Sequence, residues 1–160
     1  MKTKDQDKAL LYALKLLSMR MHSEKELTKK LYAKKFHPAE IHALLEKLKE
    51  RKLIDDSVFT RTYVDQLRNK ATGDIRIKFQ LKKKGLSEKT IENCFSKENA
   101  DDQRKRALEI ASLKLKPGKG ADPKERKRIF DYLVRKGFDF EICRDVMGKL
   151  MKMKDASAWD

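Results

Sequence analysis

The stretch IKFQLKKKGLSEKTI, residues 77–91, is one copy of a pattern that recurs along the chain. It aligns with LTKKLYAKKFHPAEI, residues 27–41, and with IFDYLVRKGFDFEIC, residues 129–143. Apolar residues occupy matching positions in the three copies, as at Leu31, Leu81 and Leu133. Self-similarity with a period of about 50 residues is typical of repeat proteins. The sequence therefore predicts three tandem copies of one unit.

Each copy is predicted to form three helices. Ser23 and Glu26 form a capping box that begins a second helix, which runs to about Lys34, and His37-Pro38 opens a third. Before them, apolar residues at steps of three and four predict an amphipathic first helix with one buried stripe: Leu10, Ala13, Leu14, Leu17 and Met21. The third helix carries a similar stripe: Ile41, Leu44, Leu45 and Leu48.

The later copies repeat these boundary signals. The predicted caps and first residues are Asp55, Asp56, Gly73-Asp74, Ser87 and Asp122-Pro123. Gly85 and Gly137 lie between the second and third helices, where a left-handed residue often ends a helix, and Lys35 holds the equivalent place in the first copy. We therefore expect Lys35 to adopt a backbone conformation that glycine would adopt more easily.

Composition supports an all-α fold of three tandem three-helix repeats. Helix-favouring Lys, Leu, Glu, Arg and Ala predominate, and the 160 residues include only six glycines and three prolines. The predicted repeats are residues 9–54, 55–98 and 101–152, with flexible ends at 1–8 and 153–160, although Trp159 could dock back. The connection at 116–123 contains Gly and Pro and is expected to be the most mobile internal loop.

The net charge of +15 predicts a polyanionic partner, either nucleic acid or an acidic protein surface rather than a membrane. No stretch approaches the length of about 18 apolar residues that a bilayer span requires. ALLYALKLL, residues 9–17, is interrupted by Lys15 and has no cleavage site after it, which favours a cytosolic helix over a secretory signal. We therefore expect a cytoplasmic protein.

The patterns of common catalytic sites are absent from the sequence. There is no Gly-rich phosphate loop, no His-Glu-x-x-His and no Cys-x-x-Cys. His22, His37 and His42 lie where capping or solvation explains them, and Asp55-Asp56 precedes a helix, whose dipole favours carboxylates. Cys94 and Cys143 are expected to be buried free thiols. The prediction is a protein without enzymatic activity, metal or cofactor.

Basic residues recur at the same turn of each copy and have two interpretations. They can be a solvated helix end, where cations suit the dipole, or an edge that binds a long polyanion. The candidate binding residues are Lys34, Lys35, Arg76, Lys82, Lys83, Lys84, Arg126, Lys127, Arg128, Arg135 and Lys136. Two helices joined by a tight turn also resemble helix-turn-helix, but they are equally a common packing unit. Aromatic residues near the cations could stack on bases or complete cores: Tyr32, Phe79 and Tyr132.

Four blocks in this order resemble the bacterial RecX family: ALLYALKLLSMRMHSEKELTKKL, LIDDSVFTRTYV, GDIRIKFQLKKKGLSEKTI and RIFDYLVRKGFDFEICRDVM. The resemblance spans about residues 9–150 and implies an elongated, curved array of three-helix repeats. It also implies a regulator of homologous recombination, DNA repair and the SOS response. Such a protein would bind the RecA nucleoprotein filament, block its extension or promote its disassembly, and lower recombinase, ATPase and coprotease activity.

The expected partners are therefore the RecA filament and, weakly, DNA, with the protein acting as a monomer. A basic helical-repeat protein that binds DNA without RecA is the alternative function. The two differ in whether bare DNA is a sufficient ligand.

Overall fold

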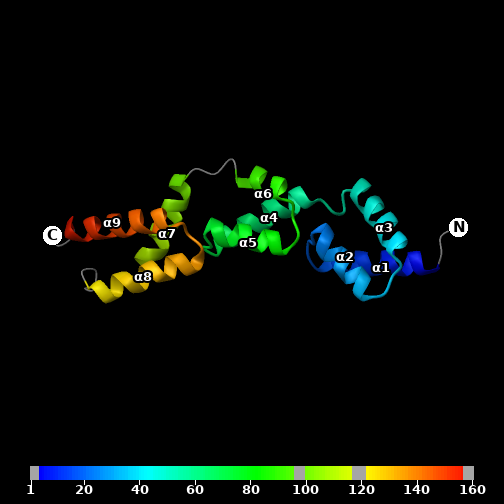
Figure 1. The fold of residues 1–160 in the computed structure, drawn as a ribbon, viewed down its shortest axis with the longest axis horizontal. Helices are drawn as coiled ribbons and strands as arrows, with labels where there is room; N and C mark the ends of the chain where they lie inside the picture. Colours follow the sequence, from blue (N-terminus) through cyan, green and yellow to red (C-terminus); the bar gives the residue numbers. More distant parts are fainter. Residues whose placement is uncertain (1–3, 96–99, 117–121, 157–160) are drawn as a thin grey trace. The chain divides into compact units, whose positions relative to one another are not determined.

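The computed structural model describes residues 4–95, 100–116 and 122–156, and in these ranges the chain forms nine helices and no strand (Figure 1). The all-α prediction is therefore confirmed. Most of the connection predicted to be mobile, and Trp159, lie outside the described residues. The helices are α1 (Lys4–Met19), α2 (Glu24–Ala33), α3 (Pro38–Glu50), α4 (Asp56–Asn69), α5 (Asp74–Lys83), α6 (Glu88–Phe95), α7 (Ala100–Lys114), α8 (Pro123–Lys136) and α9 (Phe140–Ala156).

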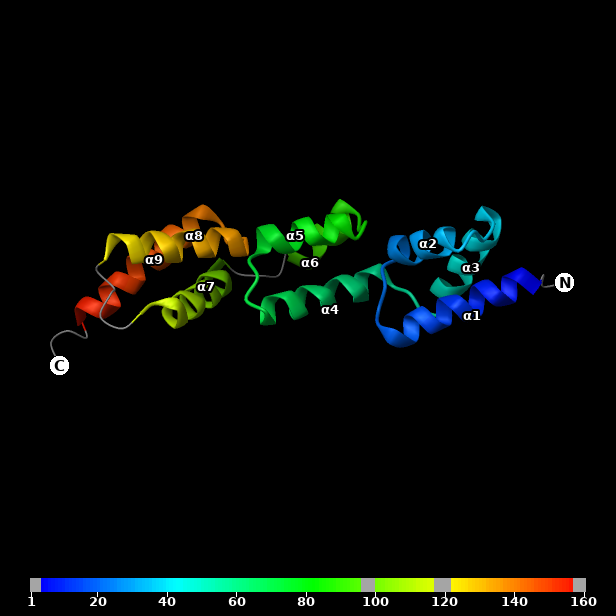
Figure 2. The ribbon, with the colours of Figure 1, turned by 90° about the horizontal axis from the view of Figure 1, so that it is seen from below.

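The helices belong to two units. Unit 1 takes its described residues from Met1–Tyr63 and Leu81–Phe95, and unit 2 takes them from Val64–Gln80 and Ser96–Asp160. In unit 1, α1, α2 and α3 pack against one another, and in unit 2, α7, α8 and α9 do the same (Figure 2). Helices α4 and α5 each contribute to both units.

The core of unit 1 follows the predicted stripes except in α1. Leu27 and Leu31 of α2 are fully buried, and every residue of the predicted stripe of α3 is buried as well. In α1 the buried residues are Ala9, Ala13 and Leu16, whereas Leu14 and Met21 are exposed. The predicted stripe of α1 is therefore confirmed at Ala13, and Leu10 and Leu17 are partly buried against the core, but the prediction is wrong for Leu14 and Met21. Two of the three buried residues of α1 are alanines, which hydrophobicity alone does not identify as core residues.

Most predicted caps are confirmed. The capping box of Ser23 is complete, and His37 accepts a hydrogen bond from the Ala39 amide through Nδ1 at 3.3 Å. Asp122 caps α8, and the Ser87 hydroxyl accepts from the Thr90 amide. Asp55 accepts hydrogen bonds from two amides of the first turn of α4, as expected of a cap.

Asp56 is a different kind of cap from the one predicted. Its Oδ1 accepts a hydrogen bond of 2.9 Å from the amide of Glu24, at the start of α2, so it caps a helix of the preceding repeat. Burial raises the pKa of Asp56, whereas the hydrogen bond from the Glu24 amide lowers it. The sequence placed a carboxylate near a helix start correctly but assigned it to the wrong helix.

The predicted left-handed residues are confirmed. Lys35 has φ 62°, Gly85 has φ 85° and Gly137 has φ 90°. Two further positive values, at Lys52 and Ala71, were not predicted.

Replacing Lys35 by glycine is expected to leave the free energy of unfolding unchanged or to raise it by up to about 1 kcal/mol, because glycine adopts this conformation without Cβ strain. Urea denaturation measures the change. The control is Lys34→Gly at the neighbouring residue, whose φ is −87°. There glycine relieves no strain and should be destabilising by about 0.5 to 1 kcal/mol. A clear fall in the melting temperature of Lys35→Gly would contradict the assignment.

In unit 2 the beginning of α5 meets the end of α8. The Gly73 amide donates to the Lys136 carbonyl at 2.9 Å, and the Ile75 amide donates to the Gly137 carbonyl at 3.1 Å. Helix ends leave amides and carbonyls without partners inside the helix, and here each end satisfies the other. A Cβ on Gly73 would overlap the backbone of Gly137, so the contact needs glycine at this point.

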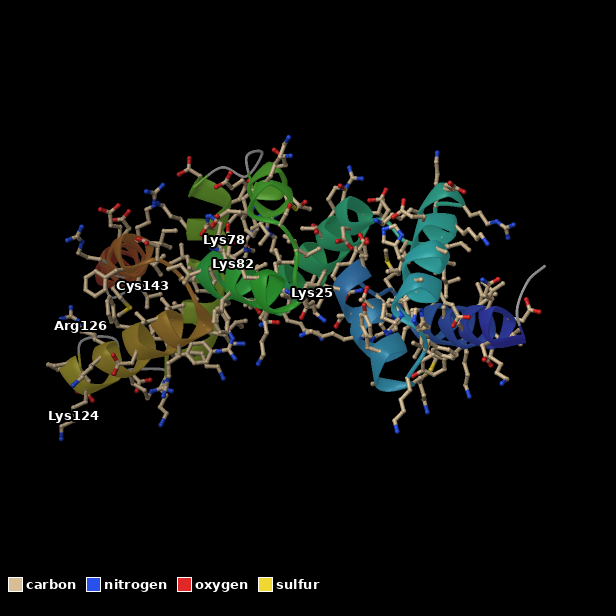
Figure 3. All side chains as sticks on the ribbon, turned by 45° about the vertical axis from the view of Figure 1, so that its right-hand side comes forward. Lys25, Lys78, Lys82, Lys124, Arg126 and Cys143 are labelled. Atoms are coloured by element: carbon tan, nitrogen blue, oxygen red, sulfur yellow. The ribbon has the colours of Figure 1, made fainter. Side chains whose placement is uncertain are left out.

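Unit 1 contains an equivalent junction, where the beginning of α2 meets the end of α5. The Ser23 hydroxyl donates to the Lys84 carbonyl at 2.8 Å, and Gly85 lies against the Lys25 side chain, which Figure 3 labels. Both junctions join the second helix of one repeat to the second helix of the next. Glycine at the end of α5 and α8 therefore meets two requirements, a left-handed backbone and a close neighbour.

Candidate functional site

The three lysines at the end of α5 have different environments. Lys82 and Lys83 are exposed. Lys84 is partly buried, because its Nζ lies 2.7 Å from Oε1 of Glu26 and 4.8 Å from the centre of the Tyr63 ring. The prediction that all three belong to an exposed helix end is therefore wrong for Lys84. This lysine joins two repeats within unit 1.

The predicted basic cluster of α8 is also divided. The guanidinium of Arg128 donates to Glu125 and to the Lys114 carbonyl, so it stabilises unit 2 internally. Arg128 also lowers the pKa of Glu125 to about 2, because it hydrogen-bonds the carboxylate. Arg126 is half-buried, whereas Lys127 is exposed. Only Lys127 of these three predicted residues presents its charge fully to solvent.

In unit 1, Lys34 and Lys35 lie at the C-terminal end of α2, and Lys82 and Lys83 lie near its N-terminal end. Lys82 and Lys83 are placed there by the hydrogen bond between the Ser23 hydroxyl and the Lys84 carbonyl, which joins the end of α5 to the beginning of α2. A helix of 10 residues is about 15 Å long, so the two basic turns are separated by about this distance. Lys34 also lies 5.6 Å above the Tyr12 ring.

Unit 2 brings three predicted residues together in a groove. The groove has a volume of about 510 Å³ and is lined by Lys70, Thr72, Arg76, Gln80, Tyr132, Arg135 and Lys136. Arg76 is held in place because its NH1 donates to the Arg135 carbonyl at 2.9 Å. Lys70 was not among the predicted residues, because it follows α4 and reaches the groove only through the tertiary fold. We name this site the basic groove.

The basic groove carries four cationic side chains and no carboxylate among its lining residues. The ring of Tyr132 lies beneath the ammonium groups of Lys114 and Lys136, at 5.3 and 5.8 Å. Cations arranged in this way attract phosphate or carboxylate groups of a ligand. The groove has the chemistry of an anion-binding site.

The aromatic residues near the basic edges are more exposed than core packing requires. Phe79 is 66% exposed and Tyr32 is 49% exposed. The interpretation of these two as core residues is therefore wrong, and only Tyr132 is half-buried. Exposed aromatic side chains remain available to contact a partner.

His22 and Cys143 are buried side chains. Burial lowers the pKa of His22, whose Nδ1 lies 2.9 Å from the Arg20 carbonyl. Burial raises the pKa of Cys143 to about 11, whereas Cys94 is only half-buried, so the expectation of burial is wrong for Cys94.

Across residues 4–95, 100–116 and 122–156, no His, Cys, Asp and Glu side chains form a group that could hold a metal ion. Within the same ranges, none of the helices is both long and apolar enough to cross a lipid bilayer.

Comparison with known families finds matches along most of the chain. Residues 9–48 match the first three-helix domain of RecX, residues 55–94 match the second, and residues 101–147 match the third.

Individual relatives agree with these matches. The chain is 34% identical to regulatory protein RecX of Chlorobium phaeobacteroides over 149 residues, which is 92% of this chain and 97% of that protein. It is 31% identical to regulatory protein RecX of Chlorobaculum tepidum over 87% of this chain and 86% of that protein. The crystal structure of RecX from Lactobacillus salivarius superposes with a TM-score of 0.81 at 27% identity, covering 91% of this chain and 96% of that one.

Proposed function

This chain belongs to the RecX family of regulatory proteins, and on that basis we propose that it inhibits the RecA recombinase. In this proposal it binds in the groove of the RecA–DNA filament and blocks extension of the filament or promotes its disassembly. RecA-dependent ATP hydrolysis, strand exchange and coprotease activity would fall as a result. The protein would act in the cytoplasm, as a monomer and without catalysing a reaction itself.

The observation that supports filament binding is the repetition of exposed cations at equivalent turns. Lys35, Lys83 and Arg135 are exposed and lie at the end of the second helix of successive repeats. A repeated array of charge suits a ligand that is itself long and repetitive, such as a nucleoprotein filament.

The basic groove supports direct DNA binding as a second function. Its four cations favour a phosphate backbone, and Tyr132 offers an aromatic ring beside them. Such binding would depend steeply on salt, with log affinity falling by about 0.9 for each phosphate neutralised.

The test of the proposed function is RecA ATP hydrolysis on single-stranded DNA, with this protein added in amounts well below RecA. Affinity for bare DNA is measured in the same buffer. Inhibition at ratios too low to coat the DNA is expected. Inhibition that begins only when the DNA is saturated would show simple competition and would favour the general DNA-binding function.

Reversing two charges of the basic groove, in the variant Lys70→Glu/Arg135→Glu, is expected to weaken binding to bare DNA by about tenfold or more and to reduce its salt dependence. Both side chains line the groove, and neither makes the hydrogen bond that holds Arg76. Lys84 is left unchanged in this variant, because a glutamate at that position would face the carboxylate of Glu26. The matched control is Lys105→Glu/Lys149→Glu, which reverses two exposed charges of unit 2 outside the groove. Equal losses in the two variants would show that net charge alone sets the affinity.

A further inference from the structure

Two large apolar side chains lie exposed one turn apart on α5. Ile75 is 56% exposed and Phe79 is 66% exposed. Residues four apart share one face of a helix, so the two side chains are neighbours. Single exposed apolar residues are ordinary on protein surfaces, but an adjacent pair of this size on one helix face needs an explanation.

The internal repeat shows that the fold does not require apolar residues at these positions. The residues equivalent to Ile75 and Phe79 are Lys25 and Lys29 in α2, and Lys127 and Asp131 in α8. All four equivalents are exposed. The second helix of the repeat therefore carries charged residues at these two positions in two of the repeats and apolar residues in the other. A property other than folding accounts for Ile75 and Phe79.

Cations border the pair on both sides. At 3.6 residues per turn, Lys78 and Lys82 fall on one side of the pair, and Arg76 and Lys83 fall on the other. Figure 3 labels Lys78 and Lys82 along α5. All four cations are exposed, whereas Asp74, the carboxylate of this helix, is buried against Arg68 and Arg106. We name Ile75, Phe79, Lys78, Lys82 and Lys83 the α5 face, whereas Arg76 lines the basic groove.

We propose that the α5 face is a docking surface for a protein that presents an apolar pocket bordered by carboxylates. The inference rests on the proposed function: within the RecA–DNA filament, this face contacts RecA protein and not the DNA. An apolar centre with a charged border is the usual anatomy of a protein interface, and a large aromatic residue often dominates its binding energy.

The chemistry of Ile75 favours a protein over a nucleic acid as the partner. Single-stranded nucleic acid stacks its bases on aromatic rings and contacts cations through its phosphates. Phe79 and the cations would serve that purpose, but Ile75 has no ring on which a base could stack. An apolar pocket on a protein buries both side chains of the pair away from water.

The test exchanges the pair for the residues of the first repeat, in the variant Ile75→Lys/Phe79→Lys. Lys25 and Lys29 show that the scaffold accepts lysine at both places, so circular dichroism and melting temperature should stay close to those of the original protein. The amount of protein needed for half-inhibition of RecA ATP hydrolysis is expected to rise by about tenfold or more. Affinity for bare DNA is expected to stay equal or to rise, because positive charge is added.

Two further variants complete the test. Leu113→Lys changes an exposed apolar residue of α7 and should leave inhibition unaltered. Phe79→Leu keeps an apolar side chain without a ring and should keep most of the inhibition. Loss of DNA affinity together with inhibition in Phe79→Leu would assign the face to base stacking and overturn the inference.

The outcomes separate this inference from the proposed function. If the original protein inhibits RecA and the lysine variant inhibits it equally well, the inference is wrong and the proposed function stands. If the original protein has no effect on RecA, the proposed function fails, and the inference that rests on it fails with it.

Discussion

Replacing Gly137 by alanine is expected to lower the free energy of unfolding by about 2 to 4 kcal/mol. Two costs combine at this residue. Its φ of 90° is unfavourable for any residue with a Cβ. The added Cβ would also overlap Cβ of Arg76 and lie 2.6 Å from the Arg76 amide nitrogen. The first turn of α5 would have to move away from the end of α8, which would break the hydrogen bonds between the two helix ends.

Two other glycines provide controls for this prediction, which thermal and urea denaturation would test. Gly85 has a similar φ, but a Cβ there would meet only the flexible side chain of Lys25, so Gly85→Ala should cost about 1 to 2 kcal/mol. Gly148 lies within α9 with nothing within 4 Å of an added Cβ, and Gly148→Ala should be stabilising by up to about 1 kcal/mol. A cost at Gly137 no larger than at Gly85 would contradict the close contact between α5 and α8.

Replacing Glu26 by glutamine is expected to remove up to about 3 kcal/mol of stability at neutral pH. The carboxylate lies 2.7 Å from Nζ of Lys84 and 3.2 Å from NH1 of Arg20. Burial by itself would raise the pKa of Glu26, but hydrogen bonds from Arg20 and Lys84 outweigh it and lower the pKa to about 2. The folded protein therefore holds the charged form more strongly than the unfolded chain does.

This shift predicts the direction of the pH dependence. The ordinary pKa of a glutamate is 4.5, so the contribution of Glu26 is complete above about pH 4.5 and is lost as the pH falls toward 2. Urea unfolding at pH 7 and at about pH 3 should show a smaller difference for Glu26→Gln than for the original protein. An unchanged difference would show that this carboxylate does not stabilise the fold through its charge.

Glu88 supplies the matched control for Glu26. It also pairs with a lysine, Lys82, at 2.7 Å, but the side chains of this pair are 70% and 59% exposed. Exposed ion pairs contribute little because water screens them. Glu88→Gln is therefore expected to leave the free energy of unfolding unchanged within error. Because both ion pairs are 2.7 Å long, the comparison shows how much burial alone adds to the stability that an ion pair contributes.

The predicted features that the structure confirms depend on neighbours in the sequence. The capping box at Ser23, proline at the start of α3 and the left-handed residues at Lys35 and Gly85 each involve contacts within one turn of a helix. The repeat period is likewise a property of the linear sequence, because every copy must bury the same face. These signals were sufficient to predict the all-α class and the tandem repeats and to identify the resemblance to the RecX family.

The candidate site was predicted less well, because exposure depends on residues that are distant in sequence. Lys84 and Lys83 are adjacent, yet only Lys84 reaches Glu26 of the preceding repeat. Lys70 joins Arg135 and Lys136 in the basic groove through the packing of unit 2. The sequence therefore shows where basic residues cluster, but not which of them the fold leaves exposed.

The sequence by itself determined the number of repeats, the helices in each and most of the caps and left-handed residues, because these follow from periodicity and from hydrogen bonds within a turn. Only the tertiary structure decided that Asp56 caps α2, that Gly137 contacts the beginning of α5 and that Phe79 is exposed. The physical reason is that an apolar or charged residue has the same local preference whether it packs inside the protein or faces solvent. Its role is decided when helix ends from different repeats meet and bury some side chains while leaving their neighbours exposed.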